Sequence, residues 1–199
     1  MCPKVTGQHK IEIKEKIIQA AIESFAETGF DKTKMEDIAK RLSLSKGTIY
    51  LYFASKEELF LAICEHYLKV MKQQQHSTIF LKKEDIVLDA ERFYDNFRQL
   101  MEGNDRVILE MIVESSRNAK LKKGMYEHRL KVYDAIFDHL NKQIERGFIK
   151  KDIDVNGLAS ALVALHDGLI AGRMLGMSEA YSKKAWIVMV RAMMEGISN

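Results

Sequence analysis

Proline is almost absent from this sequence of 199 residues, which contains a single one, Pro3, ahead of the first helical pattern. Because proline interrupts helices, a chain nearly free of it can form long ones. Turn-forming residues are also sparse, with 11 glycines and few clusters of turn formers. The composition therefore favours long helices and disfavours an all-β fold, which needs frequent turns.

Cysteine is scarce as well, with only Cys2 and Cys64. These two residues provide neither a disulfide framework nor a CxxC pair, which suits a reducing cytoplasm. Cys64 and His66 flank Glu65, but no second Cys/His pair follows nearby, so we interpret them as a core cysteine and a surface histidine and expect no metal site. An apolar run of about 18 residues and a signal-peptide layout are also missing. We therefore expect a soluble cytoplasmic protein that does not associate with membranes.

Common catalytic signatures are missing too. The sequence has no HExxH, no GxxxxGK[ST], no GxSxG and no GxGxxG, the patterns that mark zinc hydrolysis, phosphate binding, a serine nucleophile or dinucleotide binding. We therefore expect no enzyme activity and no cofactor.

Charge of one sign is not in large excess, since the formal net charge is only +3. Locally the balance changes: residues 32–56 contain six basic and two acidic residues, a net charge of +4. Neutralising DNA phosphates requires a local basic patch of this kind and not a basic protein overall.

The same region carries the most informative pattern, from Thr33 to Leu59. Thr33 followed by Glu36 has the spacing of a capping box, which predicts a helix start. The apolar residues that follow have the spacing of one buried helical stripe: Met35, Ile38, Ala39 and Leu42. Ser43-Leu44-Ser45 breaks that pattern, and Ser45 can cap a new helix.

The new helix is short, and its two faces differ. Ile49 and Phe53, four residues apart, can face inward, and Ser55 with Glu58 forms a second capping box that starts the next helix. The outward residues are Lys46, Gly47, Thr48, Tyr50 and Tyr52. Two helices joined by a tight turn, the second exposing its N-terminal side chains, form a helix-turn-helix, whose second helix enters the major groove of DNA.

These residues resemble the DNA-binding segment of the TetR family of transcriptional regulators. Gly47-Thr48-Ile49-Tyr50, Tyr52-Phe53 and Lys56-Glu57-Glu58-Leu59 all fall at the family's spacing, and the resemblance is dense from about Ala20 to Ala62. One departure is that Lys34 and Met35 stand where many members carry a Thr or Ser that contacts phosphate. The DNA-binding residues that we predict are Thr33, Lys34, Ser45, Lys46, Gly47, Thr48, Tyr50, Tyr52 and Lys56.

Within that set, the resemblance implies separate roles. Thr48 and Tyr50 are expected at base edges or nearby phosphates, and Tyr52 and Lys56 at the DNA backbone. A two-fold symmetric regulator implies a near-palindromic double-stranded operator.

The rest of the chain also has helical periodicity, so we predict an all-α fold of about nine helices. Further helices are expected over residues 10–28, 85–101, 105–118, 120–146, 152–175 and 178–196. Gly29 and Gly147 are placed to end two of them, and Asp152 or Asp154 to cap a third. We predict a helix-turn-helix domain over residues 1–55, preceded by a flexible arm at 1–9, and an effector-binding and dimerisation domain over 56–199.

Aromatic and methionine side chains at helical spacing fill the middle of the second domain. Such residues can be plain core or can line an apolar cavity, because methionine adapts to irregular shapes; the resemblance implies an effector pocket here. The candidate pocket residues are Phe93, Phe97, Met101, Met111, Met125, Tyr133, Phe137 and His166. The adjacent polar pair His166 and Asp167 fits either a pocket or hydrogen bonding at a dimer interface.

The last two helices are apolar around most of their circumference, which indicates burial on all sides. Small residues four apart on the first would let another helix approach closely. Internal packing is one explanation; a homodimer, which the resemblance also implies, is the one we favour. The candidate interface residues are Ala164, Gly168, Gly172, Gly176, Trp186, Met189 and Met193.

Together these observations predict a homodimeric transcriptional regulator, a repressor released from its operator by a small apolar effector such as a fatty acyl-CoA or a drug-like molecule. The alternative is a ligand-binding or enzymatic helical protein with a vestigial helix-turn-helix.

Overall fold

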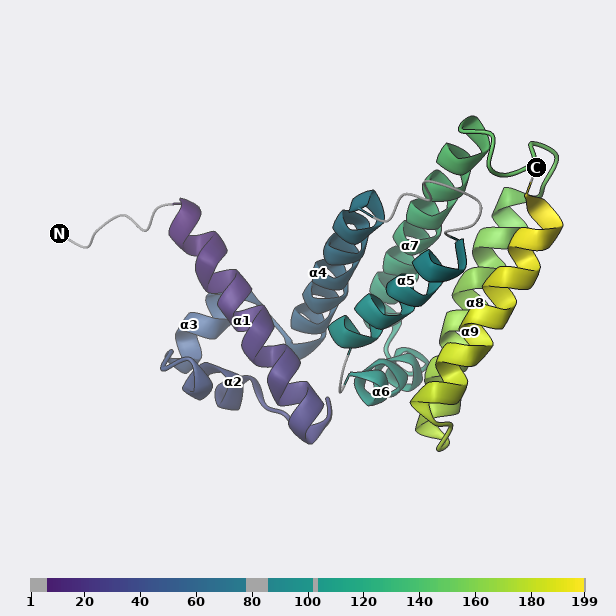
Figure 1. Ribbon diagram of the computed structural model, residues 1–199. Coiled ribbons are helices and arrows are strands. Elements are labelled where there is room, and N and C mark those ends of the chain that lie inside the picture. Colours follow the sequence, from purple (N-terminus) through teal and green to yellow (C-terminus); the bar gives the residue numbers. More distant parts are fainter. Residues whose placement is uncertain (1–6, 78–85, 102–103, 199) are drawn as a thin grey trace. The chain divides into compact units, whose positions relative to one another are not determined.

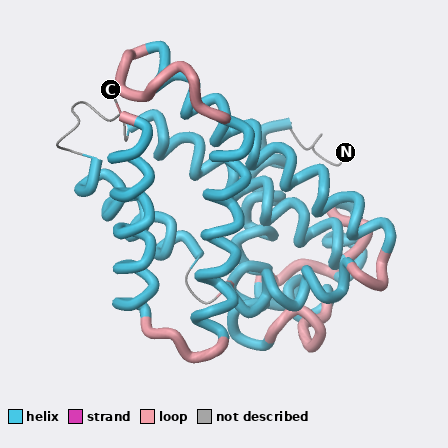
Figure 2. The backbone as a smooth tube through the Cα atoms, turned by 90° about the vertical axis from the view of Figure 1, so that its right-hand side faces the viewer, coloured by secondary structure: helices cyan, strands magenta, loops and turns pink. Residues whose placement is uncertain are grey.

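The computed structural model describes residues 7–77, 86–101 and 104–198. Within these ranges the regular structure consists of α-helices, together with one isolated antiparallel bridge between Ile149 and Ser198. Figure 2 shows only helices and connecting loops in the described part of the chain, which confirms the predicted all-α fold. The helices are α1 Gly7–Thr28, α2 Met35–Arg41, α3 Lys46–Tyr52, α4 Lys56–Ser77, α5 Ile86–Met101, α6 Asp105–Ser115, α7 Ala119–Glu145, α8 Val155–Met174 and α9 Glu179–Ile197.

The chain forms two compact units. The first comprises residues 1–66 and 106–125, so α1–α3, the first half of α4, almost all of α6 and the start of α7 belong to it. The second comprises residues 67–105 and 126–199. The functional division between residues 55 and 56 stays a prediction, because it concerns the roles of segments and not their packing.

Most helix ends lie where local signals place them. Gly29, with φ of +83°, donates its N–H to the carbonyl of Phe25 at the end of α1, and Gly147, with φ of +79°, follows α7. Asp154 caps α8 by accepting a hydrogen bond from the N–H of Gly157, and Ser178 caps α9 in the same way. Helix α1 begins at Gly7, three residues before its predicted start, and residues 1–6 of the predicted arm lie outside the described residues.

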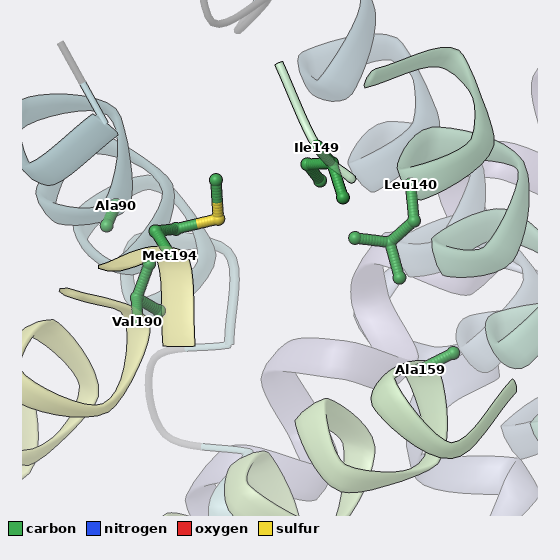
Figure 3. Packing of buried hydrophobic residues seen from close by; sticks show 6 residues of the cluster. All are labelled: Ala90, Leu140, Ile149, Ala159, Val190 and Met194. Atoms are coloured by element: carbon green, nitrogen blue, oxygen red, sulfur yellow. The ribbon is translucent and has the colours of Figure 1, made fainter. Parts of the chain in front are cut away.

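The second unit has a core drawn from four helices and the loop before α8. Ala90 of α5, Leu140 of α7, Ala159 of α8, and Val190 and Met194 of α9 are all buried. Ile149, in that loop, is fully buried beside them, and Figure 3 shows its side chain close to that of Leu140. This core explains how segments far apart in the sequence form one unit.

Helix α8 is long and apolar enough to cross a membrane by length and composition, although only 22% of that apolar stretch is buried inside the protein. This stretch is not an uninterrupted apolar run, and the sequence contains none of about 18 residues, as expected. Two charged residues interrupt the helix: Asp167 is 2.6 Å from Arg129, and Arg173 is 2.9 Å from Asp105. Charged residues are rare in membrane-spanning helices, so composition alone is weak support for a membrane span.

Candidate nucleic-acid interface

The turn between α2 and α3 joins the two helices of the predicted DNA-binding motif (Figure 1). After α2, Ser43 adopts a left-handed conformation with φ of 56°, and the N–H of Leu44 returns to the carbonyl of Ala39 at 2.9 Å. Ser45 then caps α3, because its hydroxyl oxygen accepts a hydrogen bond from the N–H of Thr48 at 3.0 Å. The predicted break and the predicted cap are both confirmed.

Helix α3 has one buried and one exposed side. Ile49 and Phe53 are buried at 0% and 1% exposure, as their spacing predicts. On the other side, the side chain of Tyr50 is 40% exposed. The hydroxyl of Thr48 lies 2.8 Å from the hydroxyl of Ser45, within hydrogen-bond distance. Leu51 is 85% exposed, and the sequence interpretation did not single it out. The signal that marks it is its position, two residues after Ile49 and therefore on the opposite side of the helix.

Acidic residues partly neutralise the basic patch. The ammonium group of Lys46 lies 2.6 Å from the carboxylate of Glu36, and this hydrogen bond is the main cause that lowers the pKa of Glu36. Arg41 pairs with Glu23 and Glu27 of α1, two acids outside the range counted from the sequence. A charge count over one segment therefore overstates the positive potential, because it omits acids that a neighbouring helix brings close.

Thr33 does not cap α2 as its spacing predicted. Helix α2 begins at Met35, and its N-cap residue is Lys34, whose side chain makes no capping hydrogen bond. Thr33 is 4% exposed, and its hydroxyl donates to the carbonyl of Gly29 at 2.7 Å and lies 2.6 Å from the hydroxyl of Thr28. The capping-box prediction is wrong here because Thr33 instead ties the loop before α2 to the end of α1. Its role at DNA, like that of exposed Lys34, stays a prediction.

Lys56, predicted at the DNA backbone, has its ammonium group inside the first unit. It donates to the carbonyls of Phe30 at 2.5 Å and Thr33 at 3.1 Å, and it lies 4.2 Å from the centre of the Phe30 ring. Burial lowers the pKa of this amine. Lys56 therefore stabilises the loop between α1 and α2, and a DNA contact would have to be made alongside these bonds or in their place.

Further hydrogen bonds hold the start of α4 and the loop between α1 and α2. Ser55 accepts a hydrogen bond from the N–H of Glu58, whose carboxylate accepts from the N–H of Ala54, so the second capping box is present with a shift of one residue. Glu110 of α6 accepts from the N–H of Phe30 at 2.7 Å. No local sequence signal could predict this contact, because Phe30 and Glu110 are 80 residues apart.

The predicted effector residues fall into both units. Phe93, Phe97 and Met101 of α5, Tyr133 and Phe137 of α7, and His166 of α8 belong to the second unit, whereas Met111 and Met125 belong to the first. In the second unit the ring of Phe97 lies 6.2 Å from that of Phe93 and 4.7 Å from that of His166. The structure thus brings three of the candidates into direct contact.

A polar group adjoins these aromatic rings. Arg129 of α7 lies 2.6 Å from the carboxylate of Asp167, whose other oxygen is 3.3 Å from Nδ1 of His166. The Nε2 atom of His166 is buried without a hydrogen-bond partner. Burial alone would raise the pKa of Asp167, but the hydrogen bonds from His166 and Arg129 outweigh it and hold that pKa below its usual value. The aromatic rings and the paired carboxylate thus lie together in the second unit, where Phe93 and Phe97 also pack against the buried residues Leu68, Met71 and Ala135.

The candidate interface residues differ in exposure. Ala164 and Gly168 of α8 and Met189 of α9 are exposed, and Met193 is half-buried. Gly172 packs against its own chain, since a Cβ atom there would lie 2.8 Å from Cε of Met177.

Two candidates do not lie on an outward helix face. Gly176 follows the end of α8 with φ of +98°, so it ends the helix instead of continuing a stripe of small residues along it. Trp186 packs inside its own unit, where its indole N–H donates to the carbonyl of Ala90 at 3.0 Å and its ring stacks 5.7 Å from that of Phe93.

The residues that the structure describes form no group suited to binding a metal ion, and Cys64 is not a reactive thiol. No group of three or more His, Cys, Asp or Glu residues is placed there to hold a metal ion. Cys64 is half-buried, and the packing around its sulfur raises the pKa of the thiol to about 12, which disfavours the nucleophilic thiolate at neutral pH.

A capped short helix with one buried side and an exposed polar side, joined to α2 by a tight turn, defines a helix-turn-helix DNA-binding protein. Comparison with known proteins narrows this class. The model of bacterial regulatory proteins of the tetR family matches residues 17–63. The fatty acid metabolism regulator protein of Bacillus subtilis is 30% identical over 143 residues, which cover 70% of this chain and 72% of that protein. The chain belongs to the TetR family of transcriptional regulators.

Other relatives agree with this assignment. The HTH-type transcriptional regulator YfiR of Bacillus subtilis is 28% identical over 176 residues, which cover 85% of this chain and 84% of that protein. A TetR transcription regulator from Haloarcula marismortui has the same fold, with a TM-score of 0.76, 17% identity, and coverage of 95% of this chain and 100% of that one. These relatives are named as regulators and not as enzymes, which favours the regulator over the enzymatic alternative.

Proposed function

We propose that this protein is a homodimeric repressor that leaves a near-palindromic operator when a small apolar effector binds. The observation that carries the proposal is the division of α3, with Ile49 buried and Tyr50 exposed beside Lys46 and Gly47. Within its own unit the exposed side keeps one ion pair, between Lys46 and Glu36, and its polar and basic groups match DNA. The proposed place of action is the cytoplasm.

Dimerisation through α8 and α9 follows from their uncovered apolar surface. Val188 and Met189 of α9 are 54% and 51% exposed, and a Cβ atom at Gly168 of α8 would meet nothing within 4 Å. A second copy of the chain would bury these side chains and let the helices approach closely at Gly168. Two copies related by two-fold symmetry would each present one α3 helix to one half of a palindrome.

For the effector we propose a fatty acyl-CoA, with a drug-like apolar molecule as the broader class. The name of the Bacillus subtilis relative that is 30% identical, fatty acid metabolism regulator protein, favours the acyl group. The contact of Phe97 with Phe93 and His166 provides apolar surface with a polar group beside it. Residues of this kind suit an acyl chain that ends in a polar head.

The proposed release mechanism uses α4, whose residues 56–66 belong to the first unit and 67–77 to the second. Lys56, at the start of this helix, holds the loop before α2 through its bonds to Phe30 and Thr33. A shift of α4 on effector binding would therefore move the loop that leads into the helix-turn-helix. The effector can drive this change only if it binds the released state more tightly than the DNA-bound state.

Fluorescence anisotropy tests the proposal. The purified protein is titrated with duplex DNA from upstream of its own gene and with a scrambled duplex, at low and moderate salt, and then with palmitoyl-CoA or free CoA. We expect at least about tenfold tighter binding to the upstream duplex that persists with added salt, and release by palmitoyl-CoA alone. Equal and steeply salt-dependent binding to both duplexes would refute operator recognition. Tyr50→Phe should weaken specific binding, and Tyr181→Phe, which changes a 61% exposed tyrosine of α9, serves as its control.

A further inference from the structure

Leu51 is an unusually exposed apolar residue. Its side chain is 85% exposed, and among the large hydrophobic residues that the structure describes only Leu175 is more exposed, at 89%. Single exposed leucines are common on protein surfaces. This one, however, lies on α3, the helix whose exposed side we assign to DNA, between Tyr50 and Tyr52.

The helix geometry shows where Leu51 points. Successive residues of an α-helix are about 100° apart around its axis. Ile49 is fully buried and marks the inner side of α3. Counting forward by two residues places Leu51 about 200° around the helix axis from Ile49. Counting back by two residues places Gly47 at about 160° on the same scale, so both residues lie on the side away from Ile49. Gly47 and Leu51 together form the outermost line of the helix.

Gly47 makes this line suitable for close approach to a flat surface. A Cβ atom at Gly47 would meet no atom closer than the hydroxyl of Ser45, at 3.8 Å, so open space lies outside the helix at this point. Without a side chain there, the helix backbone can come near a partner. Leu51, one turn further on, is then the side chain that reaches furthest into that partner.

The chemistry of leucine restricts what it can recognise in DNA. Its side chain has no polar atom, so it cannot hydrogen-bond a phosphate or a base edge. The major groove offers one apolar feature, the C5-methyl group of thymine. We propose that Leu51 contacts a thymine methyl group in each operator half-site and so selects a T·A pair at that position. This assignment rests on the proposed DNA-binding function and adds a specificity-determining residue to it.

The expected effect is modest and measurable. Burying one methyl group corresponds to about fourfold in affinity at each half-site. Loss of the contact at both half-sites of a dimer's operator multiplies to about fifteenfold, since the two sites are far apart and independent.

The test uses an operator obtained by selection of the full-length protein on a library of random duplexes. Each thymine of the enriched half-site is replaced in turn by deoxyuridine, which lacks only the C5-methyl group. Affinities are then measured for the wild type, for Leu51→Ala and for Leu175→Ala, the last being a matched exposed leucine outside α3. Circular dichroism checks that both variants retain their helices.

We expect one thymine in each half-site at which deoxyuridine weakens the wild type and Leu175→Ala about fourfold while leaving Leu51→Ala unchanged. Wild-type binding that is indifferent to every replacement, or a Leu51→Ala variant as sensitive as the wild type, would overturn the assignment. The same holds for an enriched half-site without thymine. If no sequence is enriched at all, the proposed DNA-binding function fails and the assignment with it, an outcome distinct from the others.

Discussion

Replacing Asp105 by Asn tests whether a buried ion cluster holds the second unit together. Asp105, the first residue of α6, is 9% exposed and joins arginines from two other helices. Its carboxylate accepts hydrogen bonds from Arg98 at 3.0 and 3.1 Å and from Arg173 at 2.9 and 3.1 Å. The Arg173 side chain is only 8% exposed, so it would keep a poorly solvated charge once the carboxylate is lost.

The size of the effect follows from which charges remain uncompensated. Removing one partner of a buried ion pair costs about 3–5 kcal/mol, because the other charge stays buried. Arg98 retains a second partner, Glu179, at 3.1 Å, and the amide of Asn can still accept one hydrogen bond. We therefore expect Asp105→Asn to lose about 3 kcal/mol of unfolding free energy, the low end of that range. Arg173→Met should lose less, because Asp105 keeps its pair with Arg98.

Urea denaturation at one fixed protein concentration measures these differences, since the stability of the proposed dimer would depend on concentration. Thermal unfolding should show a drop of roughly 6–12 °C for Asp105→Asn. Asp95→Asn, which breaks a more exposed pair with Lys183, is the matched control and should change the midpoint little. A loss for Asp105→Asn no larger than that of the control would refute the reasoning, as would a larger loss for Arg173→Met.

Three further results are expected. Glu36→Gln should strengthen DNA binding at low salt, because Lys46 loses the carboxylate that pairs with it at 2.6 Å; an anisotropy titration showing weaker binding would contradict this. Asp167→Asn should be less stable than the wild type at pH 7. The folded-state pKa of Asp167 is lowered, against the effect of burial, by hydrogen bonds that include one from Arg129. The stability that these bonds contribute is therefore present above the unfolded-state pKa and is lost as pH falls through the folded-state pKa. Denaturation curves at pH 7 and in acid should show the stability difference between wild type and variant becoming smaller in acid. Cys64, with its pKa raised to about 12 by burial, should resist iodoacetamide at pH 8 in the native protein and react in urea, and peptide mass spectrometry separates it from other sites.

Local sequence signals correctly predicted several helix ends, although not the start of α2. The hydroxyl of Ser45, the carboxylate of Asp154 and the hydroxyl of Ser178 cap their helices by accepting from an N–H three residues later. Gly29 adopts the positive φ for which glycine is favoured at the end of a helix. These interactions depend on neighbours within one turn, so the sequence by itself determined the helices, the helix-turn-helix and, through its motif, the family.

Tertiary structure decided which side chains remain available. The ammonium group of Lys56 bonds to carbonyls more than 20 residues away, and Thr33 turns its hydroxyl inward instead of capping α2. Trp186 is held by Ala90, 96 residues distant, and so belongs to the core of its own unit. Long polar and aromatic side chains have several partners within reach, and their choice depends on which distant segments the fold brings near. The sequence alone located the helices of this protein and several of their ends, because those signals are local, and only the fold determined which of their side chains are left to meet another molecule.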